Sequence, residues 1–391
     1  MPDTTDTLEL WKLLAQPQSR ELLQQAALVN PTDVTAVSRL RKDYDIQLVH
    51  LALDLIKARQ KALTKWPEEF VNKLFADSTG VEQASSLLVS THKAKRFLAL
   101  GKPVMDLCCG IGGDAIGFTR AGLAVQGVDM EPSRAWMTAQ NAGCPTDVSD
   151  VSQLQLNTNT VFHIDPGRRN EQGRTHNIAD YQPGLEVLET LLAQQPTGCL
   201  KLGPGVELDS LPEGEIEIIS ENGRLVQAVL WTGELAYCAR RATLLPAGLE
   251  IVGQEDDVWD VEPESEIGRY VMTFDSSVER LGLIACLCRE LDVACVHPKV
   301  GLLTSETLID SPWVTNFEVL DELPWKIKQV KAALRKHDAG IVEVKTRGKL
   351  VNPDTLQKQL RGKGDQLLTV FVLRLGDHLR AIIARRIKTS D

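Results

Sequence analysis

One short stretch of the chain, residues 104–114, most constrains what it can fold into. Its sequence, Val-Met-Asp-Leu-Cys-Cys-Gly-Ile-Gly-Gly-Asp, reads as a short apolar strand that runs directly into a glycine-rich turn. Glycines at 110, 112 and 113 let the backbone approach a ligand where a Cβ would clash. A helix that begins after such a turn presents N–H groups without intrahelical partners. The stretch therefore predicts a strand–turn–helix unit that binds a nucleotide-like ligand.

Two classes of ligand fit this loop, and its spacing alone does not separate them. Gly110, Gly112 and Ala115 match the dinucleotide pattern G-x-G-x-x-G/A. Asp106 lies four residues before the first glycine, which favours S-adenosylmethionine instead. Asp129 ends the next predicted strand, 17 residues after Gly112. A carboxylate at that place accepts hydrogen bonds from the ribose hydroxyls of either ligand.

The later strands distinguish between the two classes. Residues 161–164 form a predicted buried strand that continues into Asp-Pro-Gly-Arg-Arg at 165–169. An acidic residue at the carboxyl end of such a strand lies at the crevice of an open α/β sheet. Residues 215–220 and 225–231 flank an Asn-Gly pair at 222–223, which is a strong hairpin signal. A terminal antiparallel hairpin is foreign to nicotinamide-binding folds, but it ends the sheet of class I methyltransferases.

These motifs together resemble those of bacterial class I S-adenosylmethionine-dependent methyltransferases that carry a THUMP-like domain at the C-terminus. The resemblance rests on residues 106–114, 165–169, 180–181, 201–205, 229–233 and 303–305 and on the basic tail. Only the Asp-Pro-x-Arg-Arg element is distinctive by itself, because glycine-rich loops occur in many folds. The resemblance implies the cofactor and the architecture more firmly than the reaction.

The resemblance and the alternation of predicted elements indicate four parts. The expected fold class is α/β, a Rossmann-like class I methyltransferase sheet with an N-terminal helical domain and C-terminal ferredoxin-like and THUMP-like α+β modules. The expected boundaries are 1–98 for the helical domain, 99–250 for the methyltransferase domain, 251–315 for the ferredoxin-like module and 316–391 for the THUMP-like domain. A chain of 391 residues agrees with several domains, because it exceeds what one core usually holds.

The resemblance also implies which residues contact S-adenosylmethionine. These are Asp106, Cys108, Gly110, Gly112, Gly113, Asp114, Asp129, Met130, Asp150, Val151 and Asp165. Asp150 would accept a hydrogen bond from the adenine amino group, and its neighbour Asp147 can serve instead. The thiols of Cys108 and Cys109 are expected to act as small packing groups beside the loop.

The catalytic candidates follow the predicted strand 161–164. Asp165 would act as the general base or position the nucleophile, and its alternative role is to cap the turn after the strand. Arg168 and Arg169 would hold a phosphate or carboxylate of the substrate through paired hydrogen bonds. An ion pair with Asp180 or Glu186 is the alternative for these arginines.

Other residues are weaker candidates for the substrate path. Lys201 ends the next predicted strand and can approach the same crevice. Tyr181 and Trp231 are possible stacking surfaces for a base, or simply core residues. The basic cluster within residues 93–96 is a candidate nucleic-acid path or a solvated helix face.

The sequence argues against two kinds of base methylation. Enzymes that methylate the amino group of a base commonly have Asn/Asp-Pro-Pro followed by an aromatic residue, whereas Gly167 and Arg168 stand at these positions here. Methylation of carbon 5 of uridine needs a nucleophilic cysteine, and no Pro-Cys element follows in the chain. Neither amino-group methylation nor carbon-5 methylation is therefore favoured.

Charge is distributed unevenly along the chain. Although the net charge is −10, residues 325–391 contain 16 Lys and Arg against 6 Asp and Glu, so this segment carries +10 and the remainder −20. A basic module joined to an acidic body favours a polyanionic partner, because contacts with phosphates supply affinity that does not depend on sequence. A merely solvated charged face is the alternative. RNA, either tRNA or rRNA, is the partner predicted for residues 316–391.

Composition disfavours several other classes of protein. Eight cysteines and seven histidines show no zinc-ligand spacing, so no metal site is predicted. No apolar run approaches the ~18 residues that span a bilayer, and the start of the chain lacks the features of a signal peptide. The protein is therefore expected in the cytoplasm, without contact to membranes.

The leading functional hypothesis is an S-adenosylmethionine-dependent methyltransferase that acts on structured RNA, with the basic tail as its docking module. A methyltransferase of a small molecule or of a protein is the second hypothesis. The third is an RNA-binding protein that keeps the cofactor fold without catalysis.

Overall fold

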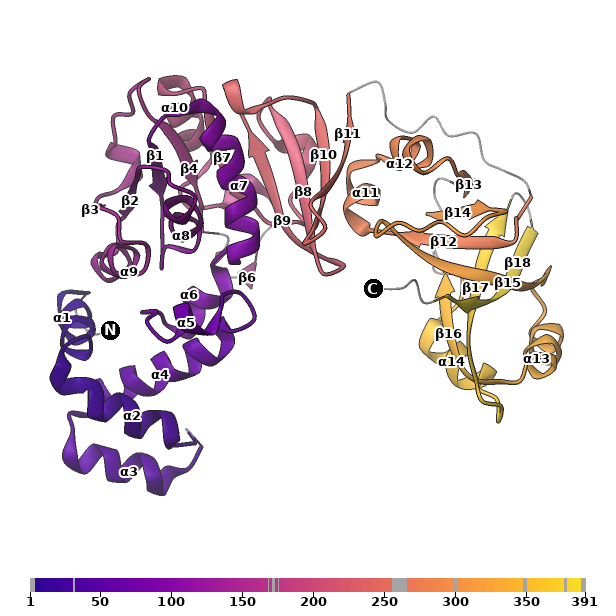
Figure 1. Cartoon of the computed structure of the whole chain (residues 1–391), viewed down its shortest axis with the longest axis horizontal. Coiled ribbons are helices and arrows are strands. Elements are labelled where there is room, and N and C mark those ends of the chain that lie inside the picture. Colours follow the sequence, from indigo (N-terminus) through magenta and orange to yellow (C-terminus); the bar gives the residue numbers. More distant parts are fainter. Residues whose placement is uncertain are drawn as a thin grey trace. The chain divides into compact units, whose positions relative to one another are not determined.

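The computed structural model describes residues 4–30, 32–167, 169–170, 173–174, 176–254, 266–297, 301–346, 350–375 and 378–387. The chain divides into two compact units (Figure 1). The first consists of Met1–Glu217 and Val226–Tyr237, and the second consists of Ile218–Leu225 and Cys238–Asp391.

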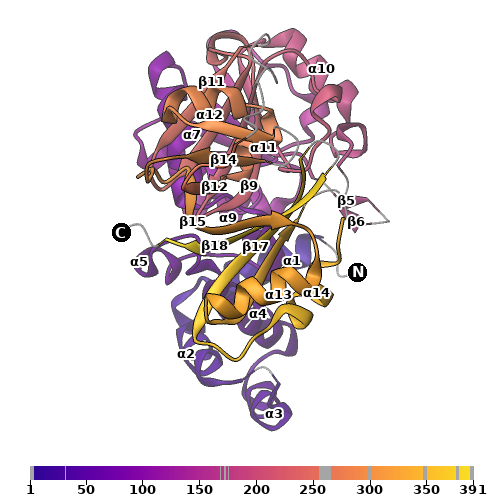
Figure 2. The ribbon, with the colours of Figure 1, turned by 90° about the vertical axis from the view of Figure 1, so that its right-hand side faces the viewer.

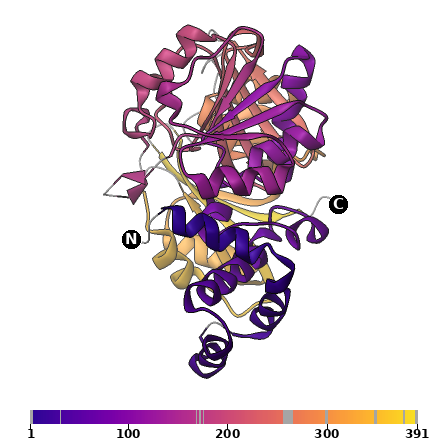
Figure 3. The ribbon, with the colours of Figure 1, turned by 90° about the vertical axis from the view of Figure 1, so that its left-hand side faces the viewer.

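Helices form the N-terminal part of the first unit. They are α1 (Thr4–Leu14), η1 (Pro17–Ser19), α2 (Arg20–Leu28), α3 (Val34–Asp43), α4 (Ile46–Ala62), α5 (Glu68–Val71), α6 (Ser78–Gln83) and α7 (Leu87–Leu100). Aspartate side chains begin several of them: the carboxylate of Asp45, for example, accepts hydrogen bonds from the N–H groups of Gln47 and Leu48. The helices share a core with the sheet domain, because Leu22 and Leu55 belong to the same buried cluster as Ile116. In Figure 3 the indigo and purple helices that precede α7 lie beneath the strands of the first unit.

A largely parallel sheet forms the centre of the first unit. Its strands are β1 (Val104–Leu107), β2 (Val125–Asp129), β3 (Thr146–Val148), β4 (Val161–Ile164), β7 (Gly198–Leu202), β8 (Glu215–Glu221) and β9 (Arg224–Trp231). They belong to a nine-stranded sheet with the order β11-β10-β8-β9-β7-β4-β1-β2-β3, in which β10 (Arg240–Leu245) and β11 (Leu249–Gly253) follow β8 at one edge. The pairs from β3 to β7 are parallel, whereas β9 is antiparallel to β7. This topology confirms the predicted Rossmann-like class I methyltransferase fold.

The topology brings distant polar residues to one edge of the sheet. Helices α8 (Gly113–Arg120), α9 (Pro132–Ala142) and α10 (Leu185–Gln194) connect the parallel strands, so these strands all end at the same side. Asp106 lies within β1, Asp129 ends β2, and Asp165 directly follows β4. Lys201 lies near the end of β7. Ligands of open α/β sheets bind at this carboxyl edge.

The second unit contains a separate seven-stranded sheet. Its elements are β12 (Tyr270–Phe274), α11 (Ser276–Leu281), α12 (Ile284–Leu291), β13 (Ala294–His297), β14 (Leu302–Ser305), β15 (Val314–Pro324), α13 (Ile327–Lys336), β16 (Ala339–Thr346), α14 (Pro353–Leu360), β17 (Gln366–Leu375) and β18 (His378–Arg386). The strand order is β13-β14-β12-β15-β18-β17-β16. An antiparallel pair, β10 (Arg240–Leu245) and β11 (Leu249–Gly253), precedes it in the chain.

Strand β15 joins the two ranges that the sequence predicts as separate C-terminal modules. It pairs with β12 on one side and with β18 on the other, and both pairings are antiparallel. The expected boundary at residue 315 therefore falls inside a strand of one continuous sheet. Figure 2 shows α13 and α14 together beside the strands of this sheet. Within the described residues, no helix is both long and apolar enough to cross a bilayer.

The packing of α7 against α8 leaves no space for a side chain at Gly117. A Cβ at this position would lie 2.5 Å from Cβ of Ser90 and 2.7 Å from its backbone carbon. Real Cβ atoms do not approach that closely, so the two helices would have to move apart. The absence of a side chain at Gly117 therefore sets the distance between α7 and α8.

We predict that Gly117→Ala lowers the free energy of unfolding by about 1–3 kcal/mol, the usual cost of overpacking a core. Urea denaturation followed by circular dichroism measures this loss. Gly184→Ala is the matched control, since its Cβ would meet nothing nearer than the carbonyl oxygen of Tyr181 at 3.7 Å. Equal stabilities of the two variants would contradict the packing argument.

Candidate active site

A cleft of about 290 Å³ lies at the carboxyl edge of the first unit's sheet. Its lining comes from α6 and the residue after it, from β1 and the glycine loop, from the end of β2 and the start of α9, and from the residues that follow β4. The lining residues are Gly80, Glu82, Gln83, Ala84, Asp106, Cys108, Cys109, Gly110, Ile111, Gly113, Asp114, Asp129, Glu131, Arg134, Asp165, Pro166 and Gly167. The cleft thus contains four of the predicted site aspartates.

The glycine loop owes its shape to two different constraints. Gly110 and Gly112 have φ values of +58° and +83°, which glycine adopts without the steric cost that a Cβ brings. Gly113 does not have a positive φ, but a Cβ at this position would lie 2.8 Å from Cβ of Ala84. Cys108 has a φ of +55°, an uncommon value for a residue with a side chain. Burial also raises the pKa of its thiol, so Cys108 is no ready nucleophile.

Asp129 is held in place by the backbone on both sides. Its Oδ2 accepts a hydrogen bond of 2.9 Å from the N–H of Gly110, and its Oδ1 accepts one of 2.9 Å from the N–H of Glu131. Burial raises the pKa of Asp129 despite these bonds. Each carboxylate oxygen has a second acceptor position. The side chain is therefore suited to accept two ribose hydroxyls while it fixes the glycine loop.

Asp106 lies beneath the loop and is almost completely buried. Its Oδ1 is 2.7 Å from Nδ1 of His163, which lies on the adjacent strand β4. Its Oδ2 has no hydrogen-bond partner in the described part of the chain. Burial raises the pKa of Asp106, and the hydrogen bond from His163 opposes that rise. A buried carboxylate oxygen without a partner at a cleft is suited to receive a donor from a ligand.

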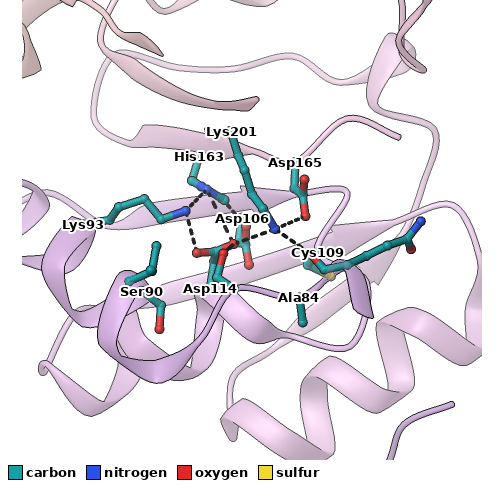
Figure 4. Close-up of polar contacts among 12 residues, drawn as sticks. Ala84, Ser90, Lys93, Asp106, Cys109, Asp114, His163, Asp165 and Lys201 are labelled. Atoms are coloured by element: carbon teal, nitrogen blue, oxygen red, sulfur yellow. Dashed lines mark hydrogen bonds and ion pairs between the residues drawn. The ribbon is translucent and has the colours of Figure 1, made fainter. Parts of the chain in front are cut away.

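Asp114 serves as an anion among buried cations (Figure 4). Its Oδ1 is 2.6 Å from Nζ of Lys93, and its Oδ2 is 3.6 Å from Nζ of Lys201. Ser85 donates a hydrogen bond of 2.9 Å to the same Oδ2. Burial opposes ionisation, but the two ammonium groups hold the pKa of Asp114 well below its usual range. Its main contacts are therefore with the protein's own lysines.

Asp165 is more accessible to a substrate than the buried carboxylates Asp106 and Asp114. Its side chain is 26% exposed, and its Oδ2 is 2.6 Å from Nζ of Lys201. Lys201 also donates a hydrogen bond of 3.0 Å to the carbonyl oxygen of Gln83. The sequence-based placement of Lys201 at this crevice is thus confirmed. Lys201 fixes one oxygen of Asp165, while Oδ1 forms no hydrogen bond among the described residues.

The structure does not describe the side chains of the two predicted arginines, Arg168 and Arg169. Arg168 lies outside the described residues, and the structure describes only the backbone of Arg169, in β5 (Arg169–Asn170). Their contact with a substrate and their pairing with Asp180 or Glu186 both stay predictions.

Four predicted cofactor residues are not part of the described lining of the cleft: Gly112, Met130, Asp150 and Val151. Met130 follows Asp129 and is 72% exposed. Asp150 accepts a hydrogen bond of 2.9 Å from the N–H of Ser152, which lowers its pKa and caps the short helix η2 (Val151–Gln153). Val151 is buried. The predicted contacts of these residues with the cofactor stay predictions.

Other sequence-based candidates lie in the core instead of on a surface. Tyr181 and Trp231 are 2% and 0% exposed, so neither can stack on a substrate base, and their alternative role as core residues holds. Lys93 and Arg96 are buried as well, and each pairs with a carboxylate within the first unit. The two interpretations of the basic cluster are therefore wrong for them, and Lys95 alone is exposed.

Sequence reasoning missed the contribution of the segment before β1. Gln83, Ala84 and Ser85 reach the site through a carbonyl oxygen, a methyl group and a hydroxyl.

The sequence did contain a signal for the burial of Lys93. This residue stands four positions after Val89 and four before Phe97, so the three share one face of α7. A lysine on an otherwise apolar face indicates a buried partner.

The residues at the cleft define a class of protein. A positive-φ glycine loop, a ribose-type acceptor at the end of β2 and an unpartnered buried carboxylate oxygen in β1 fit the ribose and the ammonium group of S-adenosylmethionine. Together with β9, which pairs antiparallel to β7 next to the parallel strands, they define a class I methyltransferase.

Comparisons with known proteins agree with this class. Residues 314–386 match the family model "THUMP domain-like", and residues 101–163 match the model "RNA cap guanine-N2 methyltransferase". The chain is 30% identical over 326 residues to an uncharacterized S-adenosylmethionine-dependent methyltransferase of Mycobacterium tuberculosis, in strains CDC 1551 and H37Rv alike. That match covers 80% of this chain and 88% of the relative.

A solved structure supports the fold over nearly the whole chain. A proposed methyltransferase of Porphyromonas gingivalis W83 has a TM-score of 0.75 and 16% identity, over 95% of this chain and 99% of that one. The protein belongs to the family of S-adenosylmethionine-dependent methyltransferases with a THUMP-like C-terminal domain. Its cofactor is S-adenosylmethionine.

The predicted role of Asp129 is tested by Asp129→Asn. We expect the dissociation constant for S-adenosylmethionine to rise roughly 10- to 100-fold, since hydrogen bonds to a charged group contribute about 1.5–3 kcal/mol. Isothermal titration calorimetry measures the change. Asp43→Asn is the control, because Asp43 is exposed on α3 and lies outside the described lining of the cleft. Unchanged affinity in Asp129→Asn would refute the assignment.

Proposed function

We propose that this methyltransferase acts on structured RNA, tRNA or rRNA, which its basic C-terminal domain docks. The observation that carries the proposal is a cationic helix in that domain. Lys328, Arg335 and Lys336 of α13 are exposed, whereas Val330 and Leu334 are buried against the sheet. The helix thus has one apolar and one cationic face.

The cations of this helix have no acidic partners among the residues that the structure describes. In the part of the chain that the structure describes, none of the basic residues of α13 forms an ion pair, nor does the preceding Lys326. Two arginines of the adjoining sheet differ from the basic residues of α13, because they do form ion pairs: Arg380 with Glu322, and Arg385 with Glu318. Cations without partners on one face are suited to neutralise the phosphates of a nucleic acid.

The family models support RNA without identifying the methylated atom. One model that matches this chain is named for a THUMP-like domain and the other for an RNA cap guanine-N2 methyltransferase. The second match ends at residue 163, before the Asp-Pro-Gly-Arg-Arg element at 165–169. That element lacks the aromatic residue common in amino-group methylation, so the proposal extends to RNA and not to guanine N2.

Asp165 is the proposed catalytic residue at the cleft. The sulfonium of S-adenosylmethionine supplies an electrophilic methyl group. Lys201 holds Oδ2 of Asp165 at 2.6 Å, which orients the carboxylate and leaves Oδ1 as an acceptor for the proton of the nucleophile. Arg168 and Arg169 are the proposed contacts with a substrate phosphate.

We predict that Asp165→Asn lowers kcat about 100-fold or more, the usual contribution of a positioned general base. Transfer of labelled methyl groups to unmodified tRNA and rRNA transcripts measures kcat. RNA affinity, measured by filter binding, should stay unchanged. Glu207→Gln, at an exposed carboxylate of the first unit, is the control. Full activity of Asp165→Asn would exclude the catalytic role, and a wild-type protein that binds RNA but transfers no label would favour the non-catalytic alternative.

We predict that the triple variant Lys328→Ala, Arg335→Ala, Lys336→Ala binds RNA more weakly and with a smaller salt dependence. The slope of log K against log salt should fall by about 2–3, because each lost phosphate contact removes about 0.7–0.9. Fluorescence anisotropy with labelled tRNA at several salt concentrations measures both effects.

The control for this variant removes the same charge elsewhere. Lys42, Lys57 and Lys73 are exposed lysines of the first unit, and their triple alanine variant should bind RNA with the wild-type salt slope. An unchanged slope in the α13 variant, or an equal loss in the control, would contradict docking by α13.

A further inference from the structure

Lys93 is a fully buried lysine that has no role in the methyl transfer proposed above. It lies on α7, and its Nζ is 2.6 Å from Oδ1 of Asp114 and 3.0 Å from Nε2 of His163 (Figure 4). A charge in such a place is stable only when it is paired and hydrogen-bonded. Asp114 supplies the opposite charge, and this favours the ammonium form of Lys93.

The contact between Lys93 and His163 determines where the imidazole carries its proton. An ammonium group donates hydrogen bonds and accepts none, so Nε2 of His163 must accept. The proton of the neutral ring then lies on Nδ1, which donates to Oδ1 of Asp106 at 2.7 Å. Oδ2 of Asp114 is 3.8 Å from Nε2, too far to accept a hydrogen bond from it.

The position of the imidazole is fixed as well as its tautomer. His163 is 0% exposed, and its ring packs edge to face against Phe118 with a centroid distance of 5.3 Å. With Oδ1 of Asp106 occupied by His163, Oδ2 is the oxygen left without a partner among the described residues. Asp106 also lines the cleft at the carboxyl edge of the sheet.

We propose that Lys93 is a positioning residue for S-adenosylmethionine. Through His163 it fixes the tautomer that holds Oδ1 of Asp106, so that Oδ2 receives a hydrogen bond from the ammonium group of the cofactor. The relay joins three elements, α7, β4 and β1, over residues that are 57 and 70 positions apart. It concerns cofactor binding and does not depend on RNA as the substrate.

The tautomer is measured first, on the unaltered protein. Protein labelled with ¹⁵N-histidine is examined by long-range ¹H–¹⁵N correlation spectra, and the His163 signals are assigned by their absence in His163→Asn. We expect a protonated Nδ1 and an unprotonated Nε2. A protonated Nε2 would overturn the proposal without any variant at position 93.

The relay is tested next by a double-mutant cycle of cofactor affinity. Lys93→Met should raise the dissociation constant for S-adenosylmethionine about tenfold in the wild-type background. In His163→Asn, the amide Nδ2–H of Asn replaces the Nδ1–H donor to Asp106 and has no tautomer to fix. There, Lys93→Met should change the affinity less than twofold.

A merely structural role of Lys93 predicts a different result. Loss of the contact with Asp114 would weaken binding equally in both backgrounds, and that outcome would overturn the proposal. Lys95→Met, at an exposed position on the same helix, should bind the cofactor as the wild type does. Calorimetry supplies the affinities, and thermal denaturation verifies that each variant is folded at the temperature of titration.

Discussion

Buried charge is the constraint on which the structure of the first unit depends. Asp106 and Asp114 are both almost completely buried, as are the two lysines that neutralise this group, Lys93 and Lys201. None of these groups is stable there alone, because an unpaired charge in a protein interior costs several kcal/mol. Each element that supplies one of them must therefore lie where the others need it, and the sheet, α7 and α8 are fixed together.

The same constraint extends along α7, away from the cleft. His92 lies 2.7 Å from Glu217, and Arg96 pairs with Glu215, both on β8. Trp231 donates from Nε1 to the same Glu217 at 2.7 Å. One helix face thus carries a row of buried polar contacts to the sheet. These contacts attach α7 to the sheet, and the predicted end of the N-terminal helical domain at residue 98 lies within this helix.

The parts of the site that the sequence predicts are those with local signals. Strand, glycine loop and helix are adjacent in residues 104–114, and Asp129 and Asp165 each follow an apolar strand. Parallel strands that end at one edge then bring these residues together. Lys201 is found in the same way, at the end of its own strand.

The parts that the sequence does not predict depend on contacts between distant residues. Lys93 and His163 are 70 positions apart, and neither resembles a functional motif by itself. The sequence of α7 suggests a basic surface because it shows Lys93 and Arg96 but not the carboxylates that pair with them in the folded protein. Strand β15 likewise joins two ranges of different composition, since pairing with β12 and β18 is set by tertiary structure.

The most direct test of this account is a crystal structure of the protein with S-adenosylhomocysteine, which has the ribose and amino acid groups of the cofactor. The account predicts the ribose hydroxyls on the carboxylate of Asp129 and the amino group within hydrogen-bond distance of Oδ2 of Asp106. A ligand bound elsewhere, or one whose amino group has other partners while Oδ2 stays without one, would contradict it.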